Sequence, residues 1–243
     1  MVRLILLAAS IMCCFAAPSQ ATPCWAEKAK VDSPAAYSHA FVMALVYVNL
    51  GLKSLASATP NQGTPVQLMT AMMAAQHEFE CAARIVKAYR KSKSARSLAP
   101  QMLRKSADGM WTISTGLSAF TKDTVDDLRR TLDGQASKAA GSEAEHRAYL
   151  TTRSKEDLEA LPMFSAALVH GLLQRPFESK RLVLTRAERS ELLGLVEKLW
   201  GSELAEGQDA VISYPGQAAQ ILKQFLSDKW LSADSPDSDL TGP

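Results

Sequence analysis

The chain has 243 residues, with 27 lysines and arginines against 25 aspartates and glutamates, a net charge of +2 and 47% hydrophobic residues. This composition excludes an intrinsically disordered chain, because such chains combine low hydrophobicity with high net charge. With 12 glycines and four cysteines it also excludes collagen-like chains and disulfide-dense scaffolds. Plentiful helix formers predict one all-α domain, with a four-helix-bundle-like core and two additional C-terminal helices.

Residues 1–21 have the pattern of a secretory signal peptide. Arg3 precedes an apolar run from Leu4 to Ala17, and Ser19-Gln20-Ala21 is a small-x-small cleavage site. Because the run is too short to span a bilayer comfortably, we expect a cleaved signal and a periplasmic or secreted chain with no transmembrane segment. An uncleaved N-terminal anchor is the alternative.

Two cysteines remain after this segment, Cys24 and Cys81. An even pair in an exported chain predicts a disulfide, which would tie residues 22–33 to the core and contribute about 4 kcal/mol in the loop-entropy model. Two reduced thiols are the alternative. A thiol-redox function is disfavoured, because the sequence has no Cys-x-x-Cys pair to lower a thiolate pKa.

The first helix of the domain is predicted to begin with Ser33 as its N-cap and Pro34 at the first helical position. Its apolar residues recur at spacings of four and three, as in a bundle seam: Phe41, Leu45, Val48, Leu52 and Leu55. The apolar stretch over residues 40–52 is too short for a membrane span, so we expect a buried central helix.

A second helix is predicted from residue 65 by an N-cap, a first-turn proline and a capping-box glutamine: Thr64, Pro65 and Gln67. A long third helix is predicted from about residue 98 to residue 132, ending by Gly134. Gly109 and Gly116 lie inside it, and each costs about 1 kcal/mol relative to alanine, so a kink near either is an open alternative.

Ser142 with Glu145 forms a capping box that predicts a fourth helix through Leu158. Pro162 is expected to break or bend the apolar continuation at residues 161–173, and Pro176 to end it. The core of the bundle is therefore predicted over residues 34–173.

The last two helices are predicted from the capping box of Thr185 with Glu188 and from Ser213 with Pro215. They form a helical pair at residues 182–231, which completes a helical domain over residues 34–231. The acidic stretch at residues 232–243 is predicted to be a disordered tail.

Motifs for catalysis, for a metal site or for a cofactor are missing from the sequence, so we predict no enzyme activity and no cofactor. Glu143 and His146 have the Glu-x-x-His spacing of dinuclear metal sites, but only one copy exists. Four residues on the second helix could supply ligands that suit Cu(I): Met69, Met72, Met73 and His77. His77, however, points roughly 150° away from the helix face that contains Met72. The alternative is that the methionines fill the core as adaptable apolar side chains.

Charge order is the one unusual surface feature, because no acidic residue occurs between Glu80 and Asp108. The predicted partner-binding residues in and around this stretch, named here the basic corner, are Lys87, Arg90, Lys91, Lys93, Arg96, Arg104 and Lys105. The dipole of the second helix explains cations at its end, but Arg104 and Lys105 fall early in the third helix, where the dipole disfavours them. Solvated helix ends are the ordinary alternative.

We expect an exported, non-enzymatic bundle whose basic corner contacts an anionic envelope component or an acidic protein face. Nucleic acid is disfavoured, because Tyr89 is the only aromatic residue interleaved with the cations. The alternative is a periplasmic bundle that binds a small ligand or metal between the second helix and the first. An enzyme of unrecognised type ranks last.

Overall fold

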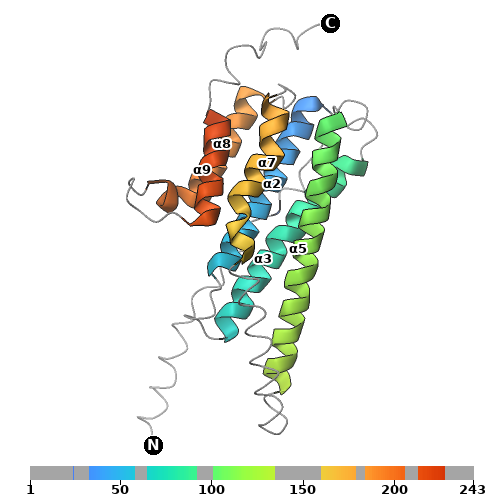
Figure 1. Cartoon of the computed structure of the whole chain (residues 1–243), viewed down its shortest axis with the longest axis vertical. Coiled ribbons are helices and arrows are strands. Elements are labelled where there is room, and N and C mark those ends of the chain that lie inside the picture. Colours follow the sequence, from blue (N-terminus) through green and yellow to red (C-terminus); the bar gives the residue numbers. More distant parts are fainter. Residues whose placement is uncertain are drawn as a thin grey trace, which may run out of the picture.

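A computed structural model describes residue 24 and residues 33–57, 65–91, 101–134, 160–178, 184–205 and 213–227. These ranges form six helices and no strand, which confirms the predicted all-α fold (Figure 1). The helices are α2 (Pro34–Ser57), α3 (Pro65–Lys91), α5 (Gln101–Gly134), α7 (Ser165–Glu178), α8 (Arg186–Ala205) and α9 (Tyr214–Ser227). The predicted signal peptide, the Ser142 capping box with its fourth helix, and the acidic tail lie outside the described residues.

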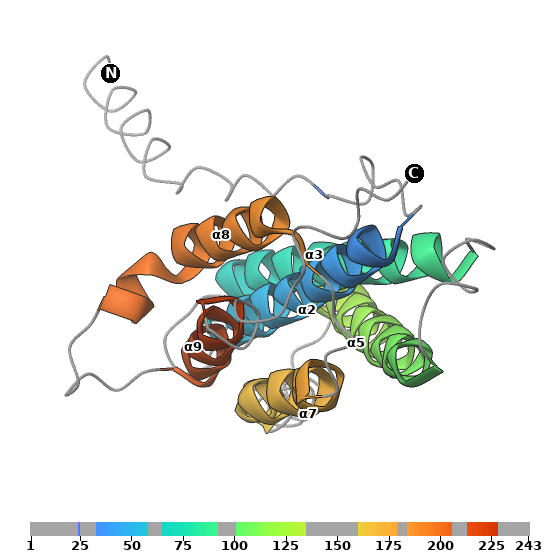
Figure 2. The same ribbon diagram turned by 90° about the horizontal axis from the view of Figure 1, so that it is seen from above.

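Helix α2 is the central helix of the bundle, as predicted. Seen end-on in Figure 2, it lies inside a ring formed by α3, α5, α7, α9 and α8, and it contacts all five. Its seam residues are at most 2% exposed: Phe41, Leu45, Val48, Leu52 and Leu55. Most of the core therefore forms around this one element.

One expectation about α2 is corrected: its apolar part extends beyond residues 40–52, a stretch that was expected to be too short for a membrane span. Residues Ala35–Ser57 are long and apolar enough to cross a membrane by length and composition, with a mean hydropathy of 1.5. In the folded chain 72% of the 18-residue apolar stretch within this range is buried. Other helices thus provide the apolar environment that its composition requires.

Helix α3 packs against α2, and its residues Met72, Phe79 and Tyr89 are fully buried. Gly51 of α2 lies directly against the ring of Phe79, so a Cβ atom there would overlap the ring. This glycine is needed because the two helices approach closely at this point.

The predicted caps at the starts of three helices are present. The Oγ atoms of Ser33 and Ser213 each accept a hydrogen bond from the backbone N–H three residues later, at 3.1 Å. At the start of α8 the backbone N–H of Thr185 donates to Glu188 Oε2 (2.8 Å), and the backbone N–H of Glu188 donates to Thr185 Oγ1 (3.2 Å). This reciprocal pair is the predicted capping box.

Prolines and glycines affect the helices less than expected in two places. Helix α5 continues through Gly109 and Gly116, where a Cβ atom would meet nothing within 4 Å. The chain does break after Pro162, with a turn at Phe164, but α7 runs to Glu178, so the prediction that Pro176 ends it is wrong. A proline removes one helical hydrogen bond and crowds one carbonyl, a cost that the last turn of this helix tolerates.

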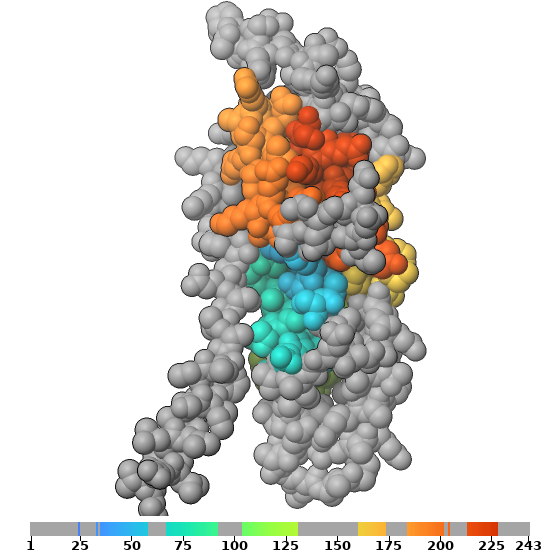
Figure 3. All heavy atoms as spheres, turned by 90° about the vertical axis from the view of Figure 1, so that its left-hand side faces the viewer, coloured from blue at the N-terminus to red at the C-terminus, as the bar shows by residue number. Residues whose placement is uncertain are grey.

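Helices α8 and α9 pack against each other and against α2, and α9 also packs on α7. Figure 3 shows α8 and α9 side by side on one face of the molecule, with parts of α2 and α3 below them. Asn49 of α2 donates a hydrogen bond to the carbonyl oxygen of Pro215 in the first turn of α9 (3.0 Å). This buried polar contact fixes the position of α9 along α2.

Helix α8 is kinked at Trp200, whose φ of −125° and ψ of 15° are not helical. Lys53 of α2 donates a hydrogen bond from Nζ to the carbonyl oxygen of Leu199 (2.9 Å), and its ammonium group lies 5.5 Å from the centre of the Trp200 ring. The cation thus meets the carbonyl where the regular helix ends, as a C-terminal cap does.

Candidate partner-binding site

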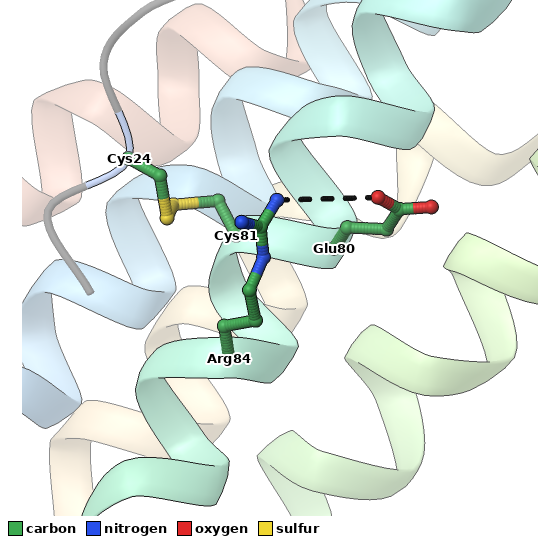
Figure 4. Close-up of a disulfide and its surroundings, with 4 residues drawn as sticks. All are labelled: Cys24, Glu80, Cys81 and Arg84. Atoms are coloured by element: carbon green, nitrogen blue, oxygen red, sulfur yellow. Dashed lines mark ion pairs between the residues drawn. A yellow bond between two sulfur atoms is a disulfide. The ribbon is translucent and has the colours of Figure 1, made fainter. Parts of the chain in front are cut away.

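The disulfide between Cys24 and Cys81 fixes residue 24 on α3, as predicted, with the two Cα atoms 5.6 Å apart. Figure 4 shows the bond beside an ion pair on the same helix, in which Arg84 lies 4.0 Å from Glu80. Gln76 also donates a hydrogen bond to Glu80 Oε1 (2.9 Å). Glu80 and Arg84 therefore partly satisfy each other's charge.

Four cations of the basic corner lie exposed where α3 ends and α5 begins. Lys87 and Lys91 are on the last two turns of α3, and Arg104 and Lys105 are in the first turns of α5. Within the described ranges these four side chains form no ion pair. Lys93 and Arg96 lie outside the described residues.

Arg90, also predicted as a partner-binding residue, joins α3 to α5. Its Nε lies 2.9 Å from Asp108 Oδ1, and its guanidinium carbon lies 5.3 Å from the centre of the Trp111 ring. Both partners are on α5. Arg90 therefore positions the two helices that carry the exposed cations.

Two buried tyrosines, Tyr37 and Tyr89, lie beside the basic corner with ring centroids 4.8 Å apart. Burial raises the pKa of Tyr37 to about 12; the negative charge of Asp108 adds to this effect, while Arg104 and Arg90 oppose it. Burial also raises the pKa of Tyr89 well above its usual value. Both phenols therefore stay neutral at physiological pH and leave the positive charge of the corner unchanged.

A groove of about 370 Å³ lies between α3 and α5, next to the basic corner. Helix α3 contributes Glu80, Ala83, Arg84 and Lys87 to its lining. Helix α5 contributes Trp111, Thr115, Ser118 and Ala119. The groove thus combines an apolar floor with charged groups on one wall.

The roles of Asp108 and Trp111 were not predicted from the sequence. Asp108 marked only the end of the stretch without acidic residues, and Trp111 was one of several apolar residues in the predicted third helix. Their spacing of three places both on one side of a helix, opposite the end of the preceding helix. That spacing, combined with Arg90 near the end of α3, was the available signal.

The methionine group on α3 does not converge on one point, since Met72 is fully buried whereas Met73 is 47% exposed. Among the described residues, no group of three or more histidine, cysteine, aspartate or glutamate side chains is arranged to hold a metal ion. The basic corner and the adjoining groove are therefore the candidate partner-binding features of the described residues.

Comparison of the chain with protein families, with characterised proteins and with solved structures found no match. Fold and site together define an all-α helical bundle with a basic corner on its surface. Fold alone does not determine function, so function has to be argued from the chemistry of that surface.

Proposed function

We propose that this chain is an exported, non-enzymatic helical-bundle protein that contacts an anionic component of the cell envelope through its basic corner. The observation that carries the proposal is the exposure of four cations at one helix–helix corner: Lys87, Lys91, Arg104 and Lys105. Their summed field attracts an anionic surface and falls off within a Debye length, about 8 Å at physiological ionic strength.

The position of two of these cations costs local stability, which favours a role outside the fold. Arg104 and Lys105 lie at the N-terminal end of α5, where the helix dipole is positive. The dipole disfavours an exposed cation in the first turn by about 0.3–1 kcal/mol and less beyond it, so the cost is at the lower end of this range for Arg104 and smaller for Lys105. The dipole of α3 favours Lys87 and Lys91 near its C-terminal end. The dipole of α5 gives no such stabilisation to Arg104 and Lys105, because they lie near its N-terminal end.

The disulfide supports the proposed compartment. Disulfides such as Cys24–Cys81 persist in oxidising environments, including the periplasm and the extracellular space. The signal-like pattern of residues 1–21 agrees with that compartment. Together they support export to the envelope or beyond it.

The test is co-sedimentation of the purified mature protein with envelope fractions from its own host. Reversing three corner cations in one variant, Lys91→Glu, Arg104→Glu and Lys105→Glu, should abolish association and leave the helical circular dichroism unchanged. Association of the wild type should weaken as salt is raised, because exposed charges are screened.

The matched control reverses three exposed cations elsewhere, Lys122, Arg186 and Lys198, and so changes the net charge equally. This control should retain association, since Lys122 lies on α5 and Arg186 and Lys198 lie on α8, all outside the basic corner. Equal binding by the corner variant, or binding that salt does not affect, would contradict the proposed function.

A further inference from the structure

We infer that the groove between α3 and α5 binds a single-chain anionic amphiphile, an acyl chain that carries a carboxylate or phosphate. The inference rests on the proposed function in one respect, because it makes the anionic envelope partner a lipid. The observations that carry it are the charge order along the groove, its apolar floor and its size.

Charge along α3 gives the groove a direction. Glu80 lies at one end, where Arg84 and Gln76 already engage it, and Lys87 lies exposed at the other end. Lys91 follows one turn beyond Lys87, on the same side of the helix. An anionic headgroup therefore lies at the Lys87 end, beside the basic corner, and is repelled from the Glu80 end.

The floor of the groove is apolar and leaves space for a chain. Ala83 and Ala119 are small residues on opposite helices, and Trp111 adds an aromatic surface between them and the corner. Arg90 lies over the Trp111 ring at 5.3 Å, which holds the indole in place before any ligand binds.

Polar groups at the floor are limited to the hydroxyls of Thr115 and Ser118, which favours an acyl chain over a peptide. The hydroxyl of Thr115 already donates to the backbone carbonyl of Trp111 (2.7 Å), so it offers a ligand no hydrogen. The volume of about 370 Å³ is near the lower limit of small-molecule pockets, about 300–1,000 Å³, which suits one chain better than two.

The direct test uses 4-bromododecanoate, whose bromine lies near the headgroup, because bromine quenches tryptophan fluorescence at short range and Trp111 lines the groove near its Lys87 end. The mature wild-type protein should be quenched in a saturable manner, and Trp111→Phe should remove most of that quenching. A matched probe of opposite charge, 4-bromododecyltrimethylammonium, should quench far less.

Two variants test the geometry. Ala119→Leu fills the groove from an exposed position and should weaken bromododecanoate binding about tenfold, as should Lys87→Glu, which replaces an attractive contact with a repulsive one. Lys198→Glu, an exposed residue of α8 outside the groove lining, should bind as the wild type does. Ala83→Leu fills the same groove from α3 and should weaken binding as well. Circular dichroism reports whether each variant folds.

The outcomes separate the groove from the basic corner. Unchanged quenching in Trp111→Phe or Ala119→Leu, or equal quenching by the two probes, overturns the inference even where the corner variant loses envelope association. An oligoglutamate peptide that binds the corner while bromododecanoate does not bind overturns the lipid assignment in favour of an acidic protein. Saturable, groove-dependent binding with association unaffected by corner reversal supports the groove and contradicts the proposed function.

Discussion

Gly51 lies against the fully buried ring of Phe79, and this contact explains why a residue without a side chain occupies this position. The sequence alone did not reveal the contact. In the sequence the glycine was only an interruption of an apolar run. Glycine normally costs a helix stability, so its presence in the central helix indicates a gain elsewhere. That gain is the close approach of α2 and α3.

Gly51→Ala should therefore destabilise the protein by about 1–3 kcal/mol, because overpacking exceeds the gain in helix propensity of about 1 kcal/mol. The measurement is the free energy of unfolding in urea. Gly109→Ala is the matched control: a Cβ atom there meets nothing within 4 Å, so this variant should gain up to about 1 kcal/mol. A Gly51→Ala protein as stable as the wild type would contradict the close approach.

The raised pKa of Tyr37 predicts alkaline sensitivity. Its phenol ionises near pH 10 in the unfolded chain and near pH 12 in the folded protein, so the unfolded state loses its proton first. Tyr37 therefore contributes about 2–3 kcal/mol to the free energy of unfolding. This contribution is fully present below about pH 10 and is lost as the pH rises through about 12.

This effect is measured by comparing the free energy of unfolding at about pH 9 and about pH 11 in the wild type and in Tyr37→Phe. The variant has no phenol at residue 37, so its stability should fall less over this interval. Identical pH slopes would show that Tyr37 titrates alike in both states.

At the scale of the helices, caps were predictable and contacts between helices were not. Ser33, Thr185 with Glu188, and Ser213 act within four residues, so their signals are complete in the local sequence. The pairing of Arg90 with Asp108 and Trp111 joins two helices, and the spacing of Asp108 and Trp111 on one helix does not by itself specify which residue of the other helix they contact. The order of charges in the sequence thus identified the exposed cations, but it did not identify the residues that position them.

The kink of α8 is another contact between helices, because Lys53 of α2 caps the carbonyl of Leu199 beside Trp200. Lys53→Met keeps most of the apolar stem and removes the donor. It should cost about 1–2 kcal/mol, since the carbonyl loses a charged hydrogen-bond partner in a partly buried place.

Urea unfolding measures that cost, and hydrogen exchange of the α8 amides shows whether it is local to the kink. Lys198→Met, an exposed lysine on α8 itself, is the control and should change stability by less than about 0.5 kcal/mol. Equal stability of the two variants would show that the Lys53 cap contributes nothing.

For the whole molecule, the predicted fold class, the central helix and the disulfide are all found in the structure. They were predictable because seam spacing, cap signals and an even cysteine pair each depend on a strong physical constraint. The packing of α7 against α9 was not predicted, since both helices show similar apolar faces and the sequence does not say which faces meet.

Replacing both cysteines by serine should cost about 4 kcal/mol, because the Cys24–Cys81 bond closes a loop with a sequence separation of 57. Urea unfolding with and without a reductant measures the loss. Reduced wild type should match the double variant, and reductant should leave the variant unchanged. An oxidised wild type no more stable than the variant would contradict a stabilising role.

The central place of α2 has a consequence for the order in which the protein is made. Helix α2 is synthesised first among the described helices, yet α8 and α9, which cover part of it, are the last to be synthesised. Its apolar surface therefore stays incompletely covered until the chain has grown past residue 227. Until then the nascent polypeptide has the exposed apolar surface that chaperones bind, so completion of this fold is necessarily late.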